Sequence, residues 1–313
     1  MTTPARSPLA HPPEVERIHR QVLSDAGLDA YTLRTSDGAG VHTFERGVGP
    51  PALMLHGSGS PGLLWWPLVR RLDGIRAIVV DRPGFGLSDP SAAGFGPSES
   101  VEWVGDVLDA LELPAAVIVG HSMGGLWGLR FALACPHRVR GLAMLGTPSL
   151  PGTRAPLPFR LLGTPGVRAV LARQRETPAS FHRFATMIGE GGTVGAHPEL
   201  VDLMVAVGND PVAGRAVLDE VGRLLSPWGL FSRTGFRRDV LVGEAELGRV
   251  DVPTLLMWGE KDPVGSGHAA HRIQGLIPNA ELEVVPGGHA PWLGQAATLA
   301  TTLVDWVQRL GDW

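Results

Sequence analysis

The segment GHSMGG, residues 120–125, places Ser122 between two glycines, Gly120 and Gly124. It directly follows the apolar run VIV and opens a stretch of helical character, LWGLRFALA. A Gly-x-Ser-x-Gly pattern in this context is typical of a nucleophile elbow, a sharp strand-to-helix turn that exposes one hydroxyl group. The same turn aims the backbone N–H of Met123 at the site. The alternative is a purely structural glycine-rich turn, and the position between strand and helix favours the nucleophile.

A serine hydroxyl needs a base, and the base needs an orienting acid. Two segments that follow apolar strands supply candidates: EKDPV after PTLLMWG contains Asp262, and PGGHAPW after ELEVV contains His289. The order serine, aspartate, histidine is the one expected for this arrangement. Alone, Asp262 also suits a helix cap or an Asp-Pro turn, and His289 a surface loop; Glu260 is a competing acid. We expect the glycine-led loop of His289 to be mobile enough to reach Ser122.

Negative charge that develops on a substrate oxygen needs hydrogen-bond donors. His56, Gly57 and Ser58 follow the first apolar strand of the central region. The N–H of Ser58 is predicted to pair with that of Met123 as an oxyanion hole, with a plain glycine turn as the alternative. We assign His56 to support of this loop, without a part in proton transfer.

The rest of the chain predicts how these residues are positioned. Short, continuous apolar runs alternate with amphipathic segments, which favours a mostly parallel sheet covered by helices on both faces. The expected strands are residues 30–35, 41–46, 51–55, 75–80, 115–119, 139–146, 253–259 and 281–285. The expected helices are 13–26, 61–72, 98–111, 123–134, 266–277 and 295–310.

The alternation of strands and helices stops after residue 147 and resumes near 249. We therefore predict an α/β core formed by residues 29–147 and 249–313, a mostly helical cap formed by 148–248, and an N-terminal helical extension formed by 1–28. An insertion at the ends of the strands would cover the place where open α/β sheets bind ligands.

Composition restricts the classes of partner. The chain has 313 residues, 44% of them hydrophobic, and a net charge of −4, which gives no indication of a nucleic-acid surface. Cys135 is the only cysteine, so an internal disulfide is excluded. There is no apolar start of signal-peptide length and no run of about 20 apolar residues, so we expect a cytoplasmic protein without membrane contact. His268 and His271 share a helix face without a third ligand, so we expect no metal site.

Five motifs together resemble the α/β-hydrolase superfamily, in the branch with a serine nucleophile and a helical cap. They are HGSG (56–59), DRPGFGLSD (81–89), GHSMGG (120–125), GEKDPV (259–264) and GGHAPW (287–292). The resemblance implies hydrolysis of esters, lactones or thioesters through an acyl-serine, without a cofactor, and a structural role for Asp81 in anchoring its loop. A serine at the elbow is unlike the dehalogenase and epoxide-hydrolase branches, which carry aspartate there. HGSGSPG is similar to the HGxGPG loop of hydrolases that split C–C bonds in diketones, although Pro61 comes one residue later.

Aromatic side chains near the predicted site indicate the substrate. Individually each suits core packing, but together they favour a small molecule with an apolar acyl or aromatic group. The predicted substrate contacts are Trp66, Trp127, Phe181, Phe184 and Trp292. Four functions share these residues: an ester or lactone hydrolase, a C–C hydrolase acting on a vinylogous diketone, an acyltransferase and a ligand-binding protein. The oligomeric state has no signal in the sequence.

Overall fold

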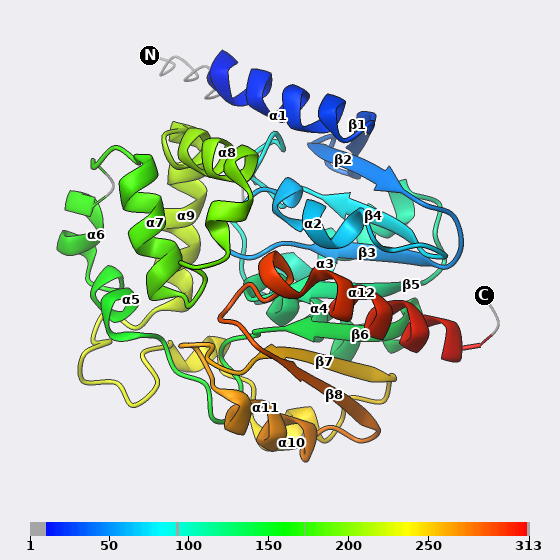
Figure 1. The fold of residues 1–313 in the computed structure, drawn as a ribbon. Helices are drawn as coiled ribbons and strands as arrows, with labels where there is room; N and C mark the ends of the chain where they lie inside the picture. Colours follow the sequence, from blue (N-terminus) through cyan, green and yellow to red (C-terminus); the bar gives the residue numbers. More distant parts are fainter. Residues whose placement is uncertain (1–10, 92–93, 172, 312–313) are drawn as a thin grey trace, which may run out of the picture.

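A computed structural model describes residues 11–91, 94–171 and 173–311, and within them eight strands form one sheet (Figure 1). The order across the sheet is β1-β2-β4-β3-β5-β6-β7-β8. The first two strands pair antiparallel with their neighbours, and all later pairs are parallel, which confirms the predicted sheet. The strands are β1 (Ala30–Arg34), β2 (Gly40–Arg46), β3 (Pro51–Leu55), β4 (Arg76–Val80), β5 (Ala116–His121), β6 (Val139–Leu145), β7 (Thr254–Gly259) and β8 (Ala280–Val285).

Each central strand is buried on both sides because successive side chains point to opposite faces. In β3, Leu53 packs on one face and Met54 on the other. The face of Met54 is covered by α2 (Trp66–Val69) and α12 (Trp292–Arg309). The face of Leu53 is covered by α3 (Pro97–Ala110), α4 (Met123–Ala134) and α11 (Gly267–Gln274). These two apolar layers fix the sheet whose strand ends carry the predicted site.

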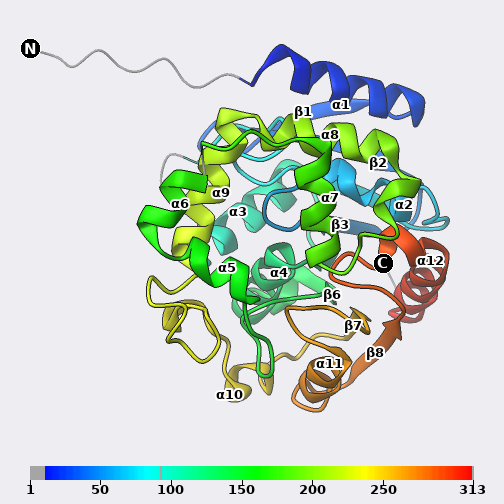
Figure 2. The same cartoon turned by 60° about the vertical axis from the view of Figure 1, so that its left-hand side comes forward.

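The segment between β6 and β7, residues 148–248, is called the insertion below. It is built from helices and contributes no strand to the described sheet. Helices α5 to α9 gather on one side of the sheet in both views (Figures 1 and 2). Their bounds are α5 (Leu157–Leu162), α6 (Pro165–Leu171), α7 (Pro178–Met187), α8 (Pro198–Gly208) and α9 (Pro211–Leu224). The last short helix is α10 (Glu244–Leu247). Its Leu247 instead packs into the apolar layer on the face of the sheet that carries Leu53.

The N-terminal helix α1 (Pro13–Asp25) joins the core to the insertion. It lies against α8, and its buried Val15 and Val22 belong to the same apolar layer as α12 (Figure 1). Just before it, Nδ1 of His11 lies 2.6 Å from the Asp210 carboxylate, the N-cap of α9. The predicted helix over 13–26 is confirmed, and the first ten residues of the predicted extension lie outside the described ranges.

The predicted helix over residues 61–72 is wrong in extent. The structure has a short 3₁₀ turn, Gly62–Trp65, followed by the single turn of α2. Pro67 supplies no backbone N–H and lies in the first turn of α2, the position where a helix tolerates proline, so α2 begins here and not at residue 61. The segment instead begins with the N–H of Gly62 bound to the Asp81 carboxylate at 2.6 Å. No helix in the described ranges is long and apolar enough to cross a membrane.

Candidate active site

Ser122 stands alone between β5 and α4 in a conformation that side chains rarely adopt. Its φ is 50° and its ψ −118°, in the left-handed region that costs a non-glycine residue roughly 1–3 kcal/mol. The turn is so tight that a Cβ on Gly124 would lie 2.1 Å from the carbonyl oxygen of Leu55. One on Gly120 would lie 2.5 Å from the backbone of Gly125. Both glycines are therefore needed for the strand, the turn and the helix to meet.

The three residues predicted from the strand ends lie together. Nε2 of His289 is 2.9 Å from Oγ of Ser122, and Nδ1 is 2.9 Å and 3.0 Å from the two oxygens of Asp262. Asp262 is buried and also accepts a hydrogen bond from the N–H of Val264 at 2.8 Å. This network assigns the ring proton to Nδ1, which leaves Nε2 free to accept the serine proton. The competing acid, Glu260, is exposed and has no place in this chain of hydrogen bonds.

The loop that carries His289 reaches the serine without any movement. The N–H of His289 donates to the carbonyl of Ile188 at 2.8 Å, and its own carbonyl accepts from Nε2 of His121 at 2.9 Å. The histidine therefore already lies at the serine, and the mobility expected of its loop stays a prediction. The sequence contains no signal for this support, because Ile188 belongs to the insertion and His121 is the variable position of the elbow motif.

The predicted oxyanion donors lie beside the serine. Met123 is the first residue of α4, where a backbone N–H has no partner within the helix. A Cβ on Gly57, next to Ser58, would lie 3.1 Å from Cβ of Ser122, so this loop touches the elbow. Across the described ranges, the N–H groups of Ser58 and Met123 donate to no protein acceptor, and their role as oxyanion donors stays a prediction.

His56, in its neutral form, supports the loop of Gly57 and Ser58, which is called the oxyanion loop below because Ser58 is the predicted donor. Its Nδ1–H donates to the carbonyl of Gly57 and its Nε2 accepts from the N–H of Arg82, each at 2.8 Å. Burial lowers the pKa of His56 to about 4, and the positive charge of Arg82 acts in the same direction. Both ring nitrogens are occupied, which agrees with the structural role expected for this residue.

Asp81 anchors the neighbouring loop, as the sequence predicts. Its two carboxylate oxygens accept from the N–H groups of Gly62 and Leu87, at 2.6 and 3.0 Å, and Nδ1 of His42 lies 2.8 Å away. Burial works to raise the pKa of Asp81, but the hydrogen bond and charge of His42 outweigh it and hold the pKa well below its usual range. Asp81 is therefore an ionised structural residue.

A buried ion pair joins the core to the insertion next to this loop. Nη1 of Arg82 lies 2.5 Å from Glu220 on α9, and both side chains are almost fully buried. The indole N–H of Trp127 also donates to this carboxylate, at 3.4 Å. Burial works to raise the pKa of Glu220, and Arg82 reverses that effect and lowers it. The sequence gives no signal for this ion pair, because Arg82 and Glu220 are 138 positions apart.

The five aromatic residues predicted to contact substrate occupy different environments. Trp292 is buried: it stacks on Trp65 with ring centroids 4.4 Å apart, and its N–H donates to the carbonyl of Leu64. Trp66 lies beside Arg46, which pairs with the amino end of β4, whereas Ser122 lies at the carboxyl ends of the strands. This placement does not favour a contact between Trp66 and substrate, and the predicted contact stays a prediction.

For the remaining three aromatic residues, contact with substrate stays a prediction. Trp127 is buried beside Phe95 and bonded to Glu220. Phe181 belongs to an apolar cluster of the insertion, and its ring stacks on Phe184 at 6.4 Å between centroids. Phe184 is 37% exposed, so its ring can contact another molecule.

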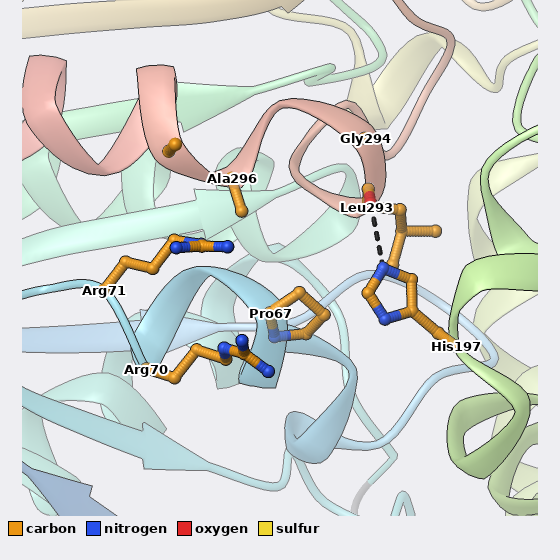
Figure 3. A pocket seen from close by; sticks show the side chains of 8 residues that line it. Pro67, Arg70, Arg71, His197, Leu293, Gly294 and Ala296 are labelled. Atoms are coloured by element: carbon orange, nitrogen blue, oxygen red, sulfur yellow. Dashed lines mark hydrogen bonds between the residues drawn. The ribbon is translucent and has the colours of Figure 1, made fainter.

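A separate surface pocket of about 180 Å³ lies between α2, the start of α12 and the insertion (Figure 3). Nε2 of His197 is bonded to the carbonyl of Leu293 at its rim, 2.9 Å away (Figure 3). Ser122, His289 and Asp262 are not among the residues that line this pocket. Within the described part of the chain, no three His, Cys, Asp or Glu side chains gather as a metal site would require.

Comparison with known proteins gives one consistent family. Residues 50–293 match the model of the alpha/beta hydrolase fold. The chain is 31% identical over 277 residues to a 2-hydroxy-6-oxononadienedioate/2-hydroxy-6-oxononatrienedioate hydrolase of Cupriavidus pinatubonensis, covering 84% of this chain and 89% of that one. It is 26% identical to a pimeloyl-[acyl-carrier protein] methyl ester esterase of Shewanella woodyi, covering 86% and 98%. The solved structure of a Bacillus subtilis carboxylesterase superposes with a TM-score of 0.73 at 24% identity, covering 95% and 99%.

Proposed function

The chain belongs to the alpha/beta hydrolase fold family and is a hydrolase of that family, and we propose that it is a serine hydrolase. Its substrate would be a carboxylic ester, a lactone or a related acyl compound with an apolar group. The observation that carries the proposal is the continuous hydrogen-bonded chain from Ser122 through His289 to Asp262. The same three residue types in the same roles perform acyl transfer on several unrelated folds.

The proposed mechanism follows from this geometry. Oγ of Ser122 attacks the substrate carbonyl carbon while Nε2 of His289 takes the hydroxyl proton. Asp262 holds the ring through Nδ1–H and stabilises the imidazolium that forms. The N–H groups of Ser58 and Met123 receive the negative charge on the carbonyl oxygen. His289 then returns the proton to the leaving alcohol, and water releases the acyl group from Ser122 by the same steps in reverse.

The apolar character of the substrate is inferred from the insertion, which we propose acts as a cap over the serine. Phe159 on α5 and Phe181 on α7 both lie within ring-contact distance of Phe184, at 6.1 and 6.4 Å between centroids. A group of phenylalanines with one exposed ring favours an apolar partner. The esterases among the similar proteins support an ester substrate. The single cysteine supports our placement of the enzyme in the reducing cytoplasm.

A second candidate is hydrolysis of a C–C bond in a vinylogous diketone by the same residues. It is favoured by the 31% identity to the oxononadienedioate hydrolase and by the HGSGSPG loop at residues 56–62. The two candidates differ in substrate rather than in catalytic groups. Comparison of kcat/KM for a panel of p-nitrophenyl esters with that for a ring-fission diketone therefore separates them.

The test of the proposal is covalent labelling of the serine. A fluorophosphonate probe should label the intact protein at Ser122, and the Ser122→Ala variant should neither label nor hydrolyse p-nitrophenyl butyrate. Removal of the nucleophile of such a triad lowers turnover by a factor on the order of 10⁶. Ester turnover that survives in Ser122→Ala, or a folded wild-type protein that does not label, would overturn the proposed mechanism.

A further inference from the structure

We propose that Glu190, in the turn after α7, is a positioning residue for His289. Its carboxylate holds the backbone of the histidine loop in the geometry that proton transfer requires. This inference rests on the proposed function, because the position of His289 matters to the reaction only if Ser122 is the nucleophile.

The hydrogen bonds that carry the inference come from three successive residues. Oε1 of Glu190 accepts from the N–H of Gly288 at 2.8 Å and from the N–H of Ala290 at 3.1 Å. Between these two, the N–H of His289 donates to the carbonyl of Ile188 at 2.8 Å. Every backbone donor of this stretch is therefore bound by the insertion, and none of the three is bound by the core sheet. One carboxylate oxygen thus fixes the peptide groups on both sides of the histidine.

The turn after α7 and the histidine loop approach each other closely because each has a glycine at the contact. A Cβ on Gly189 would lie 2.8 Å from Cα of Gly288, and a Cβ on Gly288 would lie 2.1 Å from the carbonyl oxygen of Ile188. Only glycine fits at both positions, so a side chain on either would separate the backbones and break the hydrogen bonds. The contact is a specific fit between the insertion and the histidine loop.

The chemistry of Glu190 also points to the site. Its side chain is fully buried, and it forms no ion pair with a lysine or arginine anywhere in the described structure. Its remaining oxygen, Oε2, accepts from the hydroxyl of Thr193 at 2.7 Å. Burial raises the pKa of Glu190, although Thr193 and the two loop N–H groups act to lower it.

A buried carboxylate without a cationic partner is costly, and a carbonyl group could satisfy the same N–H groups at less cost. The charged groups that face His289 are Asp262 from the loop after β7 and Glu190 from the insertion, and the neutral ring of His121 packs against it from β5. The Glu190 carboxylate therefore lies where it attracts the imidazolium that forms during turnover, in addition to fixing the loop.

The test compares three variants in the hydrolysis of p-nitrophenyl butyrate. Glu190→Ala removes the acceptor of both loop N–H groups, and we expect kcat to fall about 10- to 100-fold while KM changes less than about threefold, because the misplaced histidine affects chemistry and not binding. Glu190→Gln keeps an amide oxygen at the same reach and should restore kcat to within about fivefold of wild type. Glu199→Ala, the matched control, removes an exposed glutamate of the insertion and should behave as wild type.

Thermal unfolding and the rate of fluorophosphonate labelling, measured per folded protein, separate positioning from stability. The labelling rate should follow kcat through the series. The inference is overturned if folded Glu190→Ala has wild-type kcat, or if Glu190→Gln is as slow as Glu190→Ala. If Glu190→Ala does not fold, Glu190→Asp replaces it: its shorter reach should lower kcat, and wild-type kcat would overturn the inference. Wild-type protein that fails to label at Ser122 identifies a failure of the proposed function instead.

Discussion

Burial of a neutral histidine beneath the oxyanion loop should make the fold sensitive to acid. His56 is 1% exposed, donates from Nδ1 and accepts at Nε2. A second proton on Nε2 would break the hydrogen bond from the N–H of Arg82 and place a charge in the interior. Burial of the ring, with the nearby Arg82 charge, holds the pKa of His56 at about 4 in the folded chain.

The size of the effect follows from linkage. An unfolded chain binds the proton with a pKa of about 6.5, so between about pH 6.5 and about pH 4 the unfolded state holds more protons than the folded state. The free energy of unfolding therefore falls as the pH falls through this window, and the contribution is complete above it. The full shift corresponds to about 3 kcal/mol, of which about 2 kcal/mol is lost between about pH 7.5 and about pH 5.

Urea unfolding at these two pH values measures the loss in the wild type and in His56→Gln. Glutamine preserves an acceptor for the N–H of Arg82 but does not titrate. The variant loses the ring contact with Phe85 and should be less stable at every pH, so the quantity compared is the change in the free energy of unfolding between the two pH values. We expect this change to be about 2 kcal/mol smaller in the variant.

The exposed His137 provides the control, since His137→Gln should lose stability between the two pH values as the wild type does. His121 is also buried, its pKa lies well below its usual value because of burial and the neighbouring His289, and it remains in all three proteins. Wild type and His56→Gln that lose stability in parallel would refute the reasoning.

Three further outcomes are expected. Asp262→Asn should lower kcat by about 10⁴, because the histidine loses the partner that holds its tautomer, whereas the exposed Glu260→Gln should match wild type in the same ester assay; the reverse result would exchange the two roles. Glu220→Ala leaves Arg82 buried without its partner and should lower the free energy of unfolding, measured in urea, by about 3–5 kcal/mol. The double variant Glu220→Ala with Arg82→Met should recover most of that loss, and a double variant as unstable as Glu220→Ala would contradict this. Gly124→Ala places a methyl group 2.1 Å from a carbonyl of β3 and should sharply reduce both soluble yield and labelling, and normal yield with normal labelling would show that the elbow tolerates a Cβ.

The sheet could be predicted from the sequence because its central strands are buried on both faces. Such strands appear as continuous apolar runs, and β3, β5 and β7 begin and end within two residues of the runs that predict them. The helix predicted over residues 61–72 was wrong in extent for a local reason. Its apolar residues have helical spacing, but the segment begins with the bond from Gly62 to Asp81 and a short 3₁₀ turn, and α2 begins only at Trp66, just before Pro67.

The site could be predicted where a residue's position follows from the strand before it. Ser122, Asp262 and His289 each follow the carboxyl end of a parallel strand, and such ends meet at one edge of the sheet. Glu190 and Glu220 have no such relation to a strand. Their burial depends on how the insertion packs on the core, and the residue spacing around either glutamate gives no indication of it.

These two glutamates connect the insertion to the segments that carry the proposed catalytic residues. Glu220 binds Arg82, whose N–H is held by His56 beneath the oxyanion loop, and Glu190 binds the loop of His289. The proposed oxyanion donors and the proposed base are thus supported by the same inserted segment, from α9 and from the turn after α7. A rigid rotation of the whole insertion away from the sheet would break the Arg82–Glu220 ion pair and the hydrogen bonds of three backbone N–H groups in the histidine loop. An exchange of this insertion for that of another hydrolase should therefore preserve turnover only when acceptors equivalent to both carboxylates are carried with it.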